Sequence, residues 1–318
     1  MKKDVITIGD AMITFDPSHN GPMRFASSFE RKAGGAEFNF AIGCARLGLS
    51  TGWISRLGND EFGKFIRNFA RGEGVDVSRV QLLDDYSTSL NFKEIRADGS
   101  GRTFYYRDRS PTEALSEATL DEEPLRHCKL FHVTGVFAAI DPDKNIPLLK
   151  RAITIAKDHG AAISLDPNIR LKLWSQKQAK MGLTELLPYV DVLLIGEEEA
   201  DLLFDTHDPD ELVQTCKPYG ISTVAIKKGE KGATAYQQGE MIQVEAVSPK
   251  KVVDTVGAGD GFDAGFVYGL LKGWPLERTV QFANIIGSMV VSVYGDNEGL
   301  PELEDVLVKL GEREFIER

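Results

Sequence analysis

The chain has 318 residues, of which 42% are hydrophobic and 27% are charged, and its formal net charge is −11. This balance is typical of a globular protein, and the acidic excess argues against nucleic acid as a partner, because phosphate backbones require clustered lysine and arginine. Three widely spaced cysteines indicate neither a disulfide framework nor a zinc site. Since no apolar run approaches about 18 residues and the N-terminus leads into a strand, we expect a cytoplasmic protein without a membrane partner.

The first strand is predicted at residues 5–9, where Val5-Ile6-Thr7-Ile8-Gly9 is a short apolar run, and Asp10 follows at its carboxyl end. Ligands gather at that edge in open α/β sheets. Further strands are expected at 13–16, 25–31, 89–95 and 102–106, without the interleaved helices of βαβ units. We interpret them as a small β layer, inserted at about 12–33 and 88–108, that works as a lid over an active site.

Paired glycines open an alanine-rich helix at Gly34-Gly35-Ala36-Glu37-Phe38-Asn39. Because glycine lets a ligand approach the backbone closely, this turn is a candidate substrate contact, with Asn39 projecting from the first helical turn. Tight helix packing with a satisfied Asn39 is the alternative. The segment 58–64 has the spacing of a P-loop but is followed by Phe65, where Ser or Thr must hold Mg²⁺, so we interpret it as the start of a helix instead.

The candidate lid ends in Phe104-Tyr105-Tyr106-Arg107. Strand alternation predicts Tyr105 and Arg107 on one face and Tyr106 on the other. Aromatic rings beside a guanidinium suit a sugar ring that carries an acid group, because arginine can bind a carboxylate through two hydrogen bonds. A solvated edge strand is the alternative.

From Leu130 onward strands and helices alternate, which predicts a doubly wound, mostly parallel sheet flanked by helices, in a single α/β domain spanning residues 1–318. Polar clusters stand at three expected strand ends: Asp166-Pro167-Asn168-Ile169-Arg170, Gly196-Glu197-Glu198-Glu199 and Lys227-Lys228-Gly229-Glu230-Lys231-Gly232. The third cluster precedes a hairpin and is a candidate track for the phosphates of a nucleotide. A solvated loop is the alternative for each.

The strongest signal is Asp254-Thr255-Val256-Gly257-Ala258-Gly259-Asp260, followed by an apolar helix at about 261–271. Small residues let backbone N–H groups point at a phosphate, and a helix N-terminus adds about half a positive charge. Asp260 would repel that phosphate, so it is better explained as the base that accepts the proton of an attacking substrate hydroxyl. An ordinary helix cap is the alternative. A second helix, at about 276–293, carries Asn284.

These motifs, in this order and over nearly the whole chain, resemble those of the ribokinase family of carbohydrate kinases, also called the phosphofructokinase B type. The family signature Asp-Thr-x-Gly-Ala-Gly-Asp is complete at residues 254–260. The resemblance implies a ribokinase-like central sheet with a small β lid, ATP and Mg²⁺ as cofactors, and transfer of the ATP γ-phosphate to a hydroxyl of a small sugar or sugar acid. It also implies that Asp260 is the proton acceptor and that Gly257, Ala258 and Gly259 form the anion hole.

Within the family the chain is most similar to the 2-keto-3-deoxygluconate kinases. Residues that this likeness assigns to the sugar acid are Gly35, Tyr105, Tyr106, Arg107, Arg170, Asp260 and Asp296, and the patterns above add Asp10, Gly34 and Asn39. Residues assigned to the nucleotide are Asn168, Lys227, Lys228, Gly229, Glu230, Lys231, Gly232 and the 257–260 turn, with Arg170, Glu199 and Asn284 added. Glu199 is matched to an indirect Mg²⁺ contact, and activation by a monovalent cation such as K⁺ near Asp254 is left open.

The first hypothesis is therefore an ATP-dependent kinase of 2-keto-3-deoxygluconate. A fructokinase or another hexose or nucleoside kinase on the same scaffold is the enzyme alternative, and a sugar sensor without catalysis is the other. Arg107 and Arg170 favour a carboxylate-bearing substrate, whereas an acidic Glu113 after the lid would be unfavourable beside that carboxylate. Apolar lid residues lead us to expect a homo-oligomer through the lid: Phe25, Phe29, Phe92 and Phe104.

Overall fold

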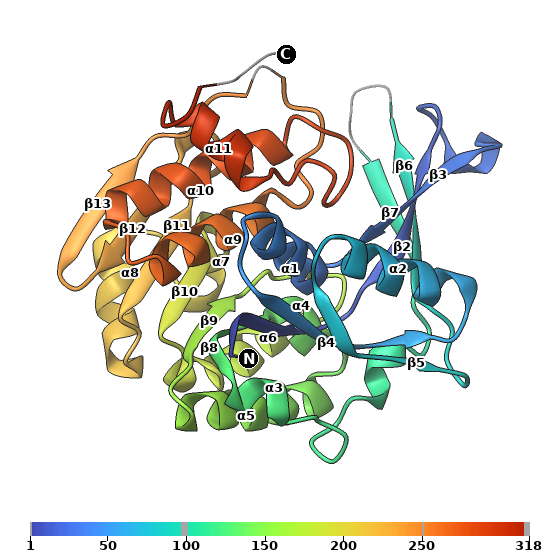
Figure 1. Cartoon of the computed structure of the whole chain (residues 1–318), viewed down its shortest axis with the longest axis horizontal. Coiled ribbons are helices and arrows are strands. Elements are labelled where there is room, and N and C mark those ends of the chain that lie inside the picture. Colours follow the sequence, from blue (N-terminus) through green and yellow to red (C-terminus); the bar gives the residue numbers. More distant parts are fainter. Residues whose placement is uncertain (1, 97–100, 250, 315–318) are drawn as a thin grey trace.

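The computed structural model describes residues 2–96, 101–249 and 251–314. In these ranges a nine-stranded main sheet has the order β13-β12-β11-β10-β9-β8-β1-β4-β5 (Figure 1). Neighbouring strands are parallel from β5 across to β11, and β12 and β13 complete the sheet as an antiparallel hairpin. The predicted doubly wound, mostly parallel sheet is confirmed.

The main sheet is apolar on both faces. Within β10, Leu193, Leu194 and Ile195 are fully buried, as a parallel sheet covered on both sides requires. Its strands are β1 (Lys3–Ile8), β4 (Thr51–Gly58), β5 (Asp76–Leu83), β8 (Cys128–Thr134), β9 (Ala162–Asp166), β10 (Val192–Gly196), β11 (Thr223–Lys227), β12 (Ala233–Gln237) and β13 (Glu240–Val244).

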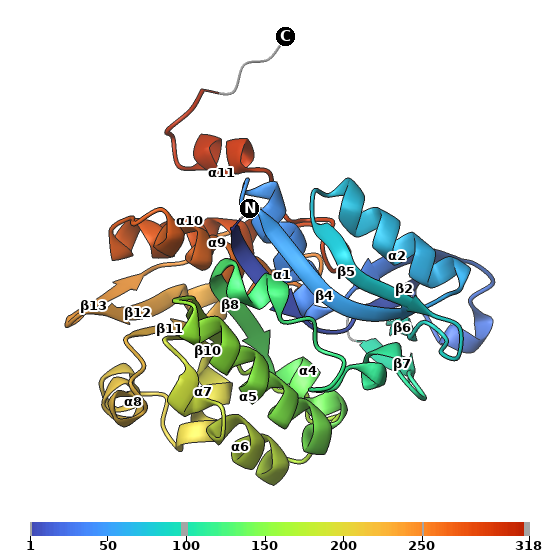
Figure 2. The same ribbon diagram turned by 60° about the horizontal axis from the view of Figure 1, so that its bottom comes forward.

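Helices cover the two faces of the sheet in two groups, each with its own buried cluster (Figure 2). Leu193 and Ile195 pack into one cluster, and Val192 and Leu194 pack into the other, because successive strand residues point to opposite faces. The first group is α3 (Glu123–Arg126), α4 (Gly135–Ile140), α5 (Pro142–Asp158), α6 (Gln176–Thr184), α7 (Glu197–Phe204) and α8 (Pro209–Cys216). The second is α1 (Ala36–Arg46), α2 (Glu61–Gly72), α9 (Ala258–Leu271), α10 (Leu276–Val290) and α11 (Leu303–Lys309). Short 3₁₀ turns lie at Met23–Phe25, Pro111–Ala114, Leu187–Tyr189, Lys217–Tyr219 and Gly229–Lys231.

A second, four-stranded sheet, here called the lid sheet, stands apart from the main sheet beside α2 (Figure 1). Its order is β3-β2-β6-β7, with β2 parallel to β6 and the other neighbours antiparallel. Its strands are β2 (Met12–Pro17), β3 (Phe29–Gly34), β6 (Leu90–Ile95) and β7 (Gly101–Tyr106).

The prediction of a strand at 25–31 was wrong about where the strand begins. Met23–Phe25 form a 3₁₀ turn after Pro22, which the Ala26 N–H closes by donating to the Met23 carbonyl, and β3 begins only at Phe29. The Phe25 side chain is 69% exposed. An apolar residue here therefore does not mark a paired strand, because the turn already uses the local backbone hydrogen bonds.

The two faces of the lid sheet differ in chemistry. On one face Phe15 stacks on Phe92, with ring centroids 4.7 Å apart, and meets Phe62 of α2. The opposite face carries Lys32 and Asn91, which are buried although they are polar. Since buried polar groups must find partners, this face is turned towards other polar groups of the protein.

The segment with P-loop spacing is the start of α2, as predicted. The Asp60 carboxylate caps the helix by accepting the Gly63 N–H at 2.8 Å, and it also accepts the Thr88 N–H. Glycine is required at position 63 because a Cβ there would lie 2.0 Å from the Gly58 carbonyl oxygen. The two glycines thus serve packing between β4 and α2.

The three cysteines, Cys44, Cys128 and Cys216, are all buried as free thiols. Burial raises the pKa of Cys216 to about 12, so this thiol stays protonated and acts as a small apolar packing group. In the parts of the chain that the structure describes, no helix combines the length and the apolar character needed to cross a bilayer.

Candidate active site

The carboxyl edge of the main sheet gathers polar residues from distant parts of the sequence. Asp10 follows β1, while Thr134, Asp166, Gly196 and Lys227 end the strands β8, β9, β10 and β11. Strand register places Thr134 opposite Asp166, and Gly196 opposite Lys227. The polar clusters predicted at 166–170, 196–199 and 227–232 therefore lie along one edge, where ligands bind in open α/β folds.

The signature motif forms the start of α9. Gly257 is the N-cap with a φ of 78°, a left-handed conformation that favours glycine. A Cβ at this position would also lie 1.9 Å from the backbone oxygen of Asp296. Because the first N–H groups of a helix have no intrahelical acceptor, the turn at 257–259 presents donors and the positive end of a 14-residue helix dipole. This turn can bind an anion.

Asp260 lies in the first turn of α9 and is only 8% exposed. Its Oδ2 accepts a hydrogen bond from Asn39 Nδ2 at 2.8 Å, and its Oδ1 accepts one from Asn168 Nδ2 at 3.4 Å. Burial raises the pKa of Asp260 to about 7, with the Asn39 hydrogen bond opposing the shift and the charge of Asp166 adding to it. A fixed carboxylate with this pKa can accept a proton near neutral pH.

Lys227 lies directly against the glycine turn. A Cβ placed on Gly259 would be 3.7 Å from Lys227 Nζ. The ammonium is held by two buried carboxylates, with Nζ 3.2 Å from Asp166 Oδ2 and 3.2 Å from Asp263 Oδ1. Although burial opposes its charge, these carboxylates raise the pKa of Lys227 above its ordinary value, so the anion-binding turn has a permanent cation beside it.

Asp263 was missed by the sequence reasoning. It lies on α9 three residues after Asp260, and residues three apart share a helix face, so spacing alone could have indicated it. Lys172 was also missed. Its Nζ lies 5.6 Å from the centre of the Tyr105 ring, which connects the lid sheet to the loop that follows β9.

Glu199 has both carboxylate oxygens turned towards backbone. Oε1 accepts the Ile169 N–H at 2.7 Å, and Oε2 accepts the Gly196 N–H at 2.9 Å. Glu199 therefore holds the loop that follows β9 against the start of α7. The described residues contain no group of three or more His, Cys, Asp or Glu side chains suited to a metal ion.

The end of the lid sheet is tied to the end of β1. Arg107 donates to Asp10 Oδ2 from Nη2 at 2.7 Å and from Nε at 3.1 Å. Among the described residues Asp10 Oδ1 has no hydrogen-bond partner although it is buried. Tyr105 faces Lys172, whereas Tyr106 packs against Phe92 on the other face of the lid sheet. The predicted alternation of Tyr105 and Tyr106 is confirmed.

The glycine pair at the start of α1 lies against the same group of residues. A Cβ on Gly35 would be 2.5 Å from the Asp10 carbonyl oxygen, and one on Gly34 would be 2.0 Å from Asp296 Oδ2. Both glycines therefore allow close approach of backbone to acidic residues, Gly35 to Asp10 and Gly34 to Asp296.

Arg170 and Asn284, which were also predicted for the site, lie at the margin of these polar residues. Arg170 is exposed, although its charge reaches Asp260 and lowers the pKa of that carboxyl against the effect of burial. Asn284 donates to the Val244 and Glu245 carbonyls at 3.2 Å and thereby fixes the chain after β13.

The turn after Lys227 is exposed from Gly229 to Lys231, and Lys231 pairs loosely with Glu197 at 3.5 Å. Lys228 is half-buried, and Gly232 closes the turn with a φ of 90°. Glu113 turns to its own backbone and accepts the Ser110 N–H at 3.1 Å. Its charge is thus engaged in a local cap, so Glu113 no longer argues against a substrate carboxylate near the end of the lid sheet.

An anion-binding helix start, a buried carboxylate beside it and a small sheet over the carboxyl edge define a phosphoryl-transfer enzyme of the α/β class. The model of the pfkB family of carbohydrate kinases matches residues 2–303, and the chain belongs to that family. The predicted ATP-dependent carbohydrate kinase is thereby confirmed.

Individual relatives agree with this family. A 2-dehydro-3-deoxygluconokinase of Bacillus subtilis (strain 168) is 35% identical over 309 residues, which cover 96% of this chain and 94% of the relative. A 5-dehydro-2-deoxygluconokinase of Geobacillus thermodenitrificans (strain NG80-2) is 30% identical, with 95% and 91% covered. The crystal structure of a putative ribokinase II from E. coli, in complex with ATP and Mg²⁺, superposes with a TM-score of 0.90 at 28% identity and covers 98% of this chain and 100% of that one.

Proposed function

We propose that this enzyme transfers the γ-phosphate of ATP to a hydroxyl of 2-dehydro-3-deoxygluconate, the sugar acid also called 2-keto-3-deoxygluconate. The Bacillus subtilis relative named for that substrate supports the choice. The observation that carries it is the placement of two guanidinium groups, Arg107 at Asp10 and Arg170 within electrostatic reach of Asp260. Arginine binds carboxylates through paired hydrogen bonds, which a neutral sugar would not need.

The same residues suggest how the reaction proceeds. The substrate hydroxyl lies next to Asp260, which accepts its proton while Asn39 and Asn168 hold the carboxylate in place. The transferred phosphoryl group is bound by the N–H groups at 257–259, with the Lys227 ammonium next to Gly259 adding positive charge. Because the phosphoryl transition state is loose, positioning and charge neutralisation contribute more than the strength of the base.

Different residues serve the two ends of the proposed site, where the nucleotide and the sugar would bind. Mg²⁺ bound with ATP supplies further neutralisation of phosphate charge, and Glu199 orders the loop after β9 that would face it. At the sugar end, the buried Asp10 Oδ1 has no hydrogen-bond donor among the residues that the structure describes, and a sugar hydroxyl can provide one.

We expect substrate choice to depend on Arg107. ADP release is measured with 2-keto-3-deoxygluconate, 5-keto-2-deoxygluconate, fructose, ribose and adenosine, and the first of these should give the highest kcat/KM. Arg107→Gln should raise KM for the sugar acid about 10- to 100-fold, because a charge-assisted bond is worth about 1.5–3 kcal/mol. The increase for a neutral sugar should be much smaller.

Arg109→Gln is the matched control, since Arg109 is in the same loop but stacks on the Tyr86 ring. It should leave both KM values close to wild type. A wild-type enzyme that prefers fructose would overturn the substrate, whereas a preference for 5-keto-2-deoxygluconate, the substrate class named for the Geobacillus relative, would move the assignment to a second sugar acid. Tight sugar binding without any ADP release would instead indicate a sensor.

The aromatic face of the lid sheet, on which Phe15 and Phe92 lie, supports a further part of the proposal, the formation of a homo-oligomer. Phe104 and Tyr106 are 37% and 59% exposed there, at the edge strand β7 of the lid sheet. An unpaired edge next to aromatic side chains favours pairing with a second copy. We expect a homo-oligomer in light-scattering measurements, and Phe104→Lys should shift it to smaller particles. A wild-type monomer at about 100 µM would contradict this expectation, because stable interfaces persist well below that concentration.

A further inference from the structure

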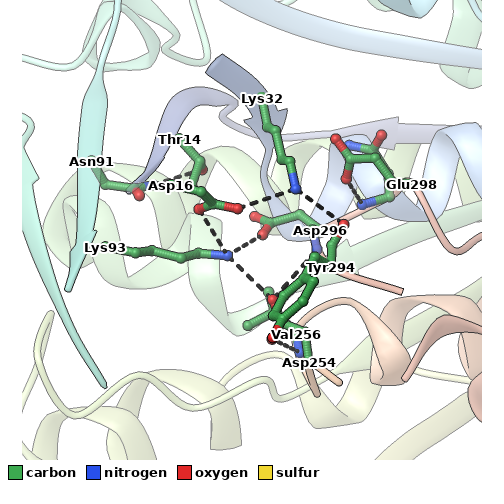
Figure 3. A network of polar contacts seen from close by, with 12 residues as sticks. Thr14, Asp16, Lys32, Asn91, Lys93, Asp254, Val256, Tyr294, Asp296 and Glu298 are labelled. Atoms are coloured by element: carbon green, nitrogen blue, oxygen red, sulfur yellow. Dashed lines mark hydrogen bonds and ion pairs between the residues drawn. The ribbon is translucent and has the colours of Figure 1, made fainter. Parts of the chain in front are cut away.

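The polar face of the lid sheet ends in a network of two lysines and three aspartates (Figure 3). Lys93 of β6 places its Nζ 3.0 Å from Asp296 Oδ1, 3.6 Å from Asp16 Oδ1 and 3.6 Å from Asp254 Oδ2. Lys32 of β3 pairs with Asp16 at 3.2 Å and donates to the Tyr294 carbonyl at 3.1 Å. Within the ranges that the structure describes, only Lys93 joins the lid sheet to Asp254, the first residue of the signature motif.

Both carboxylate oxygens of Asp254 have partners in this arrangement. Its Oδ1 accepts the Val256 N–H at 3.1 Å, and its Oδ2 accepts the Gly295 N–H at 3.4 Å and faces the Lys93 ammonium. These bonds fix the two loops that meet at the N-terminus of α9. Although burial opposes its charge, the carboxylates raise the pKa of Lys93 above its ordinary value, so the ammonium remains charged.

A monovalent cation such as K⁺ does not fit beside Asp254 in this structure. The position facing Asp254 Oδ2 is held by the Lys93 ammonium, which would repel a second cation at close range. An ammonium and K⁺ carry the same charge and are similar in size, so one can replace the other in neutralising a carboxylate.

We propose that Lys93 is a positioning residue that supplies the cation of this site from within the chain, so that turnover does not require an alkali ion. It neutralises Asp254, and through Asp254 it orders the loop that leads to the 257–259 anion hole. It also holds Asp296, which lies against Gly34 at the sugar end of the site. This inference rests on the proposed kinase reaction for its activity test.

The experiment compares kcat in buffers that contain Mg²⁺ and have tetramethylammonium as their only monovalent cation with kcat after addition of KCl or NH₄Cl at equal ionic strength. Tetramethylammonium is too large to enter the network. The kcat of wild type should change less than about twofold on addition of K⁺, because the Lys93 ammonium already occupies the position facing Asp254. In tetramethylammonium the kcat of Lys93→Ala should be about 20-fold or more below that of wild type, because the substitution leaves buried carboxylates unpaired. Addition of K⁺ or NH₄⁺ should raise the kcat of this variant by at least about tenfold.

Lys32→Ala is the matched control. Lys32 belongs to the same network and the same sheet but contacts Asp16 and a carbonyl rather than Asp254. It should show no recovery specific to K⁺ or NH₄⁺. Wild-type activity that depends tenfold or more on K⁺ would overturn the inference, as would Lys93→Ala activity that is normal without K⁺ or is not restored by it.

Thermal unfolding separates this inference from the proposed function. K⁺, compared with tetramethylammonium, should raise the unfolding midpoint of Lys93→Ala and leave that of wild type unchanged, because only the variant has room for the ion. If no sugar is phosphorylated in any salt, the proposed function fails while the unfolding midpoints still decide the role of Lys93. A K⁺-dependent midpoint for wild type, or none for the variant, would contradict that role.

Discussion

Asp260→Asn is expected to reduce kcat by about 10²- to 10⁴-fold, the usual contribution of a positioned general base, while the fold is retained. Asparagine fills nearly the same volume and its amide oxygen can still accept the Asn39 hydrogen bond. What the variant loses is the ability to take the proton of the substrate hydroxyl. KM for ATP should change little, because the backbone donors at 257–259 remain in place.

The pH dependence gives an independent test of the same residue. Because the pKa of Asp260 is raised to about 7, kcat/KM of the wild type should fall as the pH drops below about 7. Stability should change in the opposite direction. Between its ordinary pKa of 3.8 and about 7, the folded protein binds more protons at Asp260 than the unfolded chain, so this residue lowers stability as the pH rises through that window. Asp260→Asn should therefore have the higher unfolding midpoint at pH 8, and the difference should shrink towards pH 5.

Steady-state kinetics and thermal unfolding at several pH values measure both effects. Glu277→Gln is the matched control, because Glu277 is likewise an acid in the first turn of a helix but is exposed on α10. It should leave kcat and its pH profile unchanged. Near-normal turnover by Asp260→Asn would exclude the base mechanism, and a lower midpoint than wild type at pH 8 would contradict the raised pKa.

Lys227→Met is expected to be damaging in two ways. Removal of the ammonium leaves the buried carboxylates of Asp166 and Asp263 without their shared partner, which typically costs about 3–5 kcal/mol of folding free energy. It also removes the positive charge that lies next to Gly259, and loss of one such electrostatic contact typically lowers kcat by about 10²- to 10³-fold. Denaturant unfolding and single-turnover rates measure the two losses separately.

A second variant separates stability from catalysis at this position. Lys227→Met combined with Asp263→Asn removes one of the unpaired charges, so it should recover part of the stability without recovering turnover. Lys157→Met tests the opposite case, because Lys157 pairs with Asp191 at 2.7 Å on the α5 side of the sheet. It should lose stability and keep kcat. Recovery of turnover together with stability in the double variant would show that Lys227 acts only through folding.

Local patterns were sufficient for the framework of the fold and for the glycine turn at the start of α9. The alternation of strands and helices from Leu130 onward predicted a parallel sheet, because parallel neighbours are joined by crossover helices. The signature at 254–260 predicted the anion-binding helix start, because a left-handed Gly257 and small neighbours are local requirements of that turn. The prediction that a strand begins at Phe25 was wrong because a local 3₁₀ turn at Met23–Phe25 overrode the β propensity of this segment.

By itself the sequence determined the alternation of strands and helices after Leu130, the glycines at the helix starts and Asp260 as the acid next to the 257–259 turn. Only the tertiary structure decided which charges meet: Lys227 with Asp263, Arg107 with Asp10, and Lys93 with Asp254. The physical reason is that backbone conformation depends on neighbours along the chain, whereas the partner of a buried charge is whichever side chain the packed sheet and lid bring within a few ångströms, here up to 161 positions away.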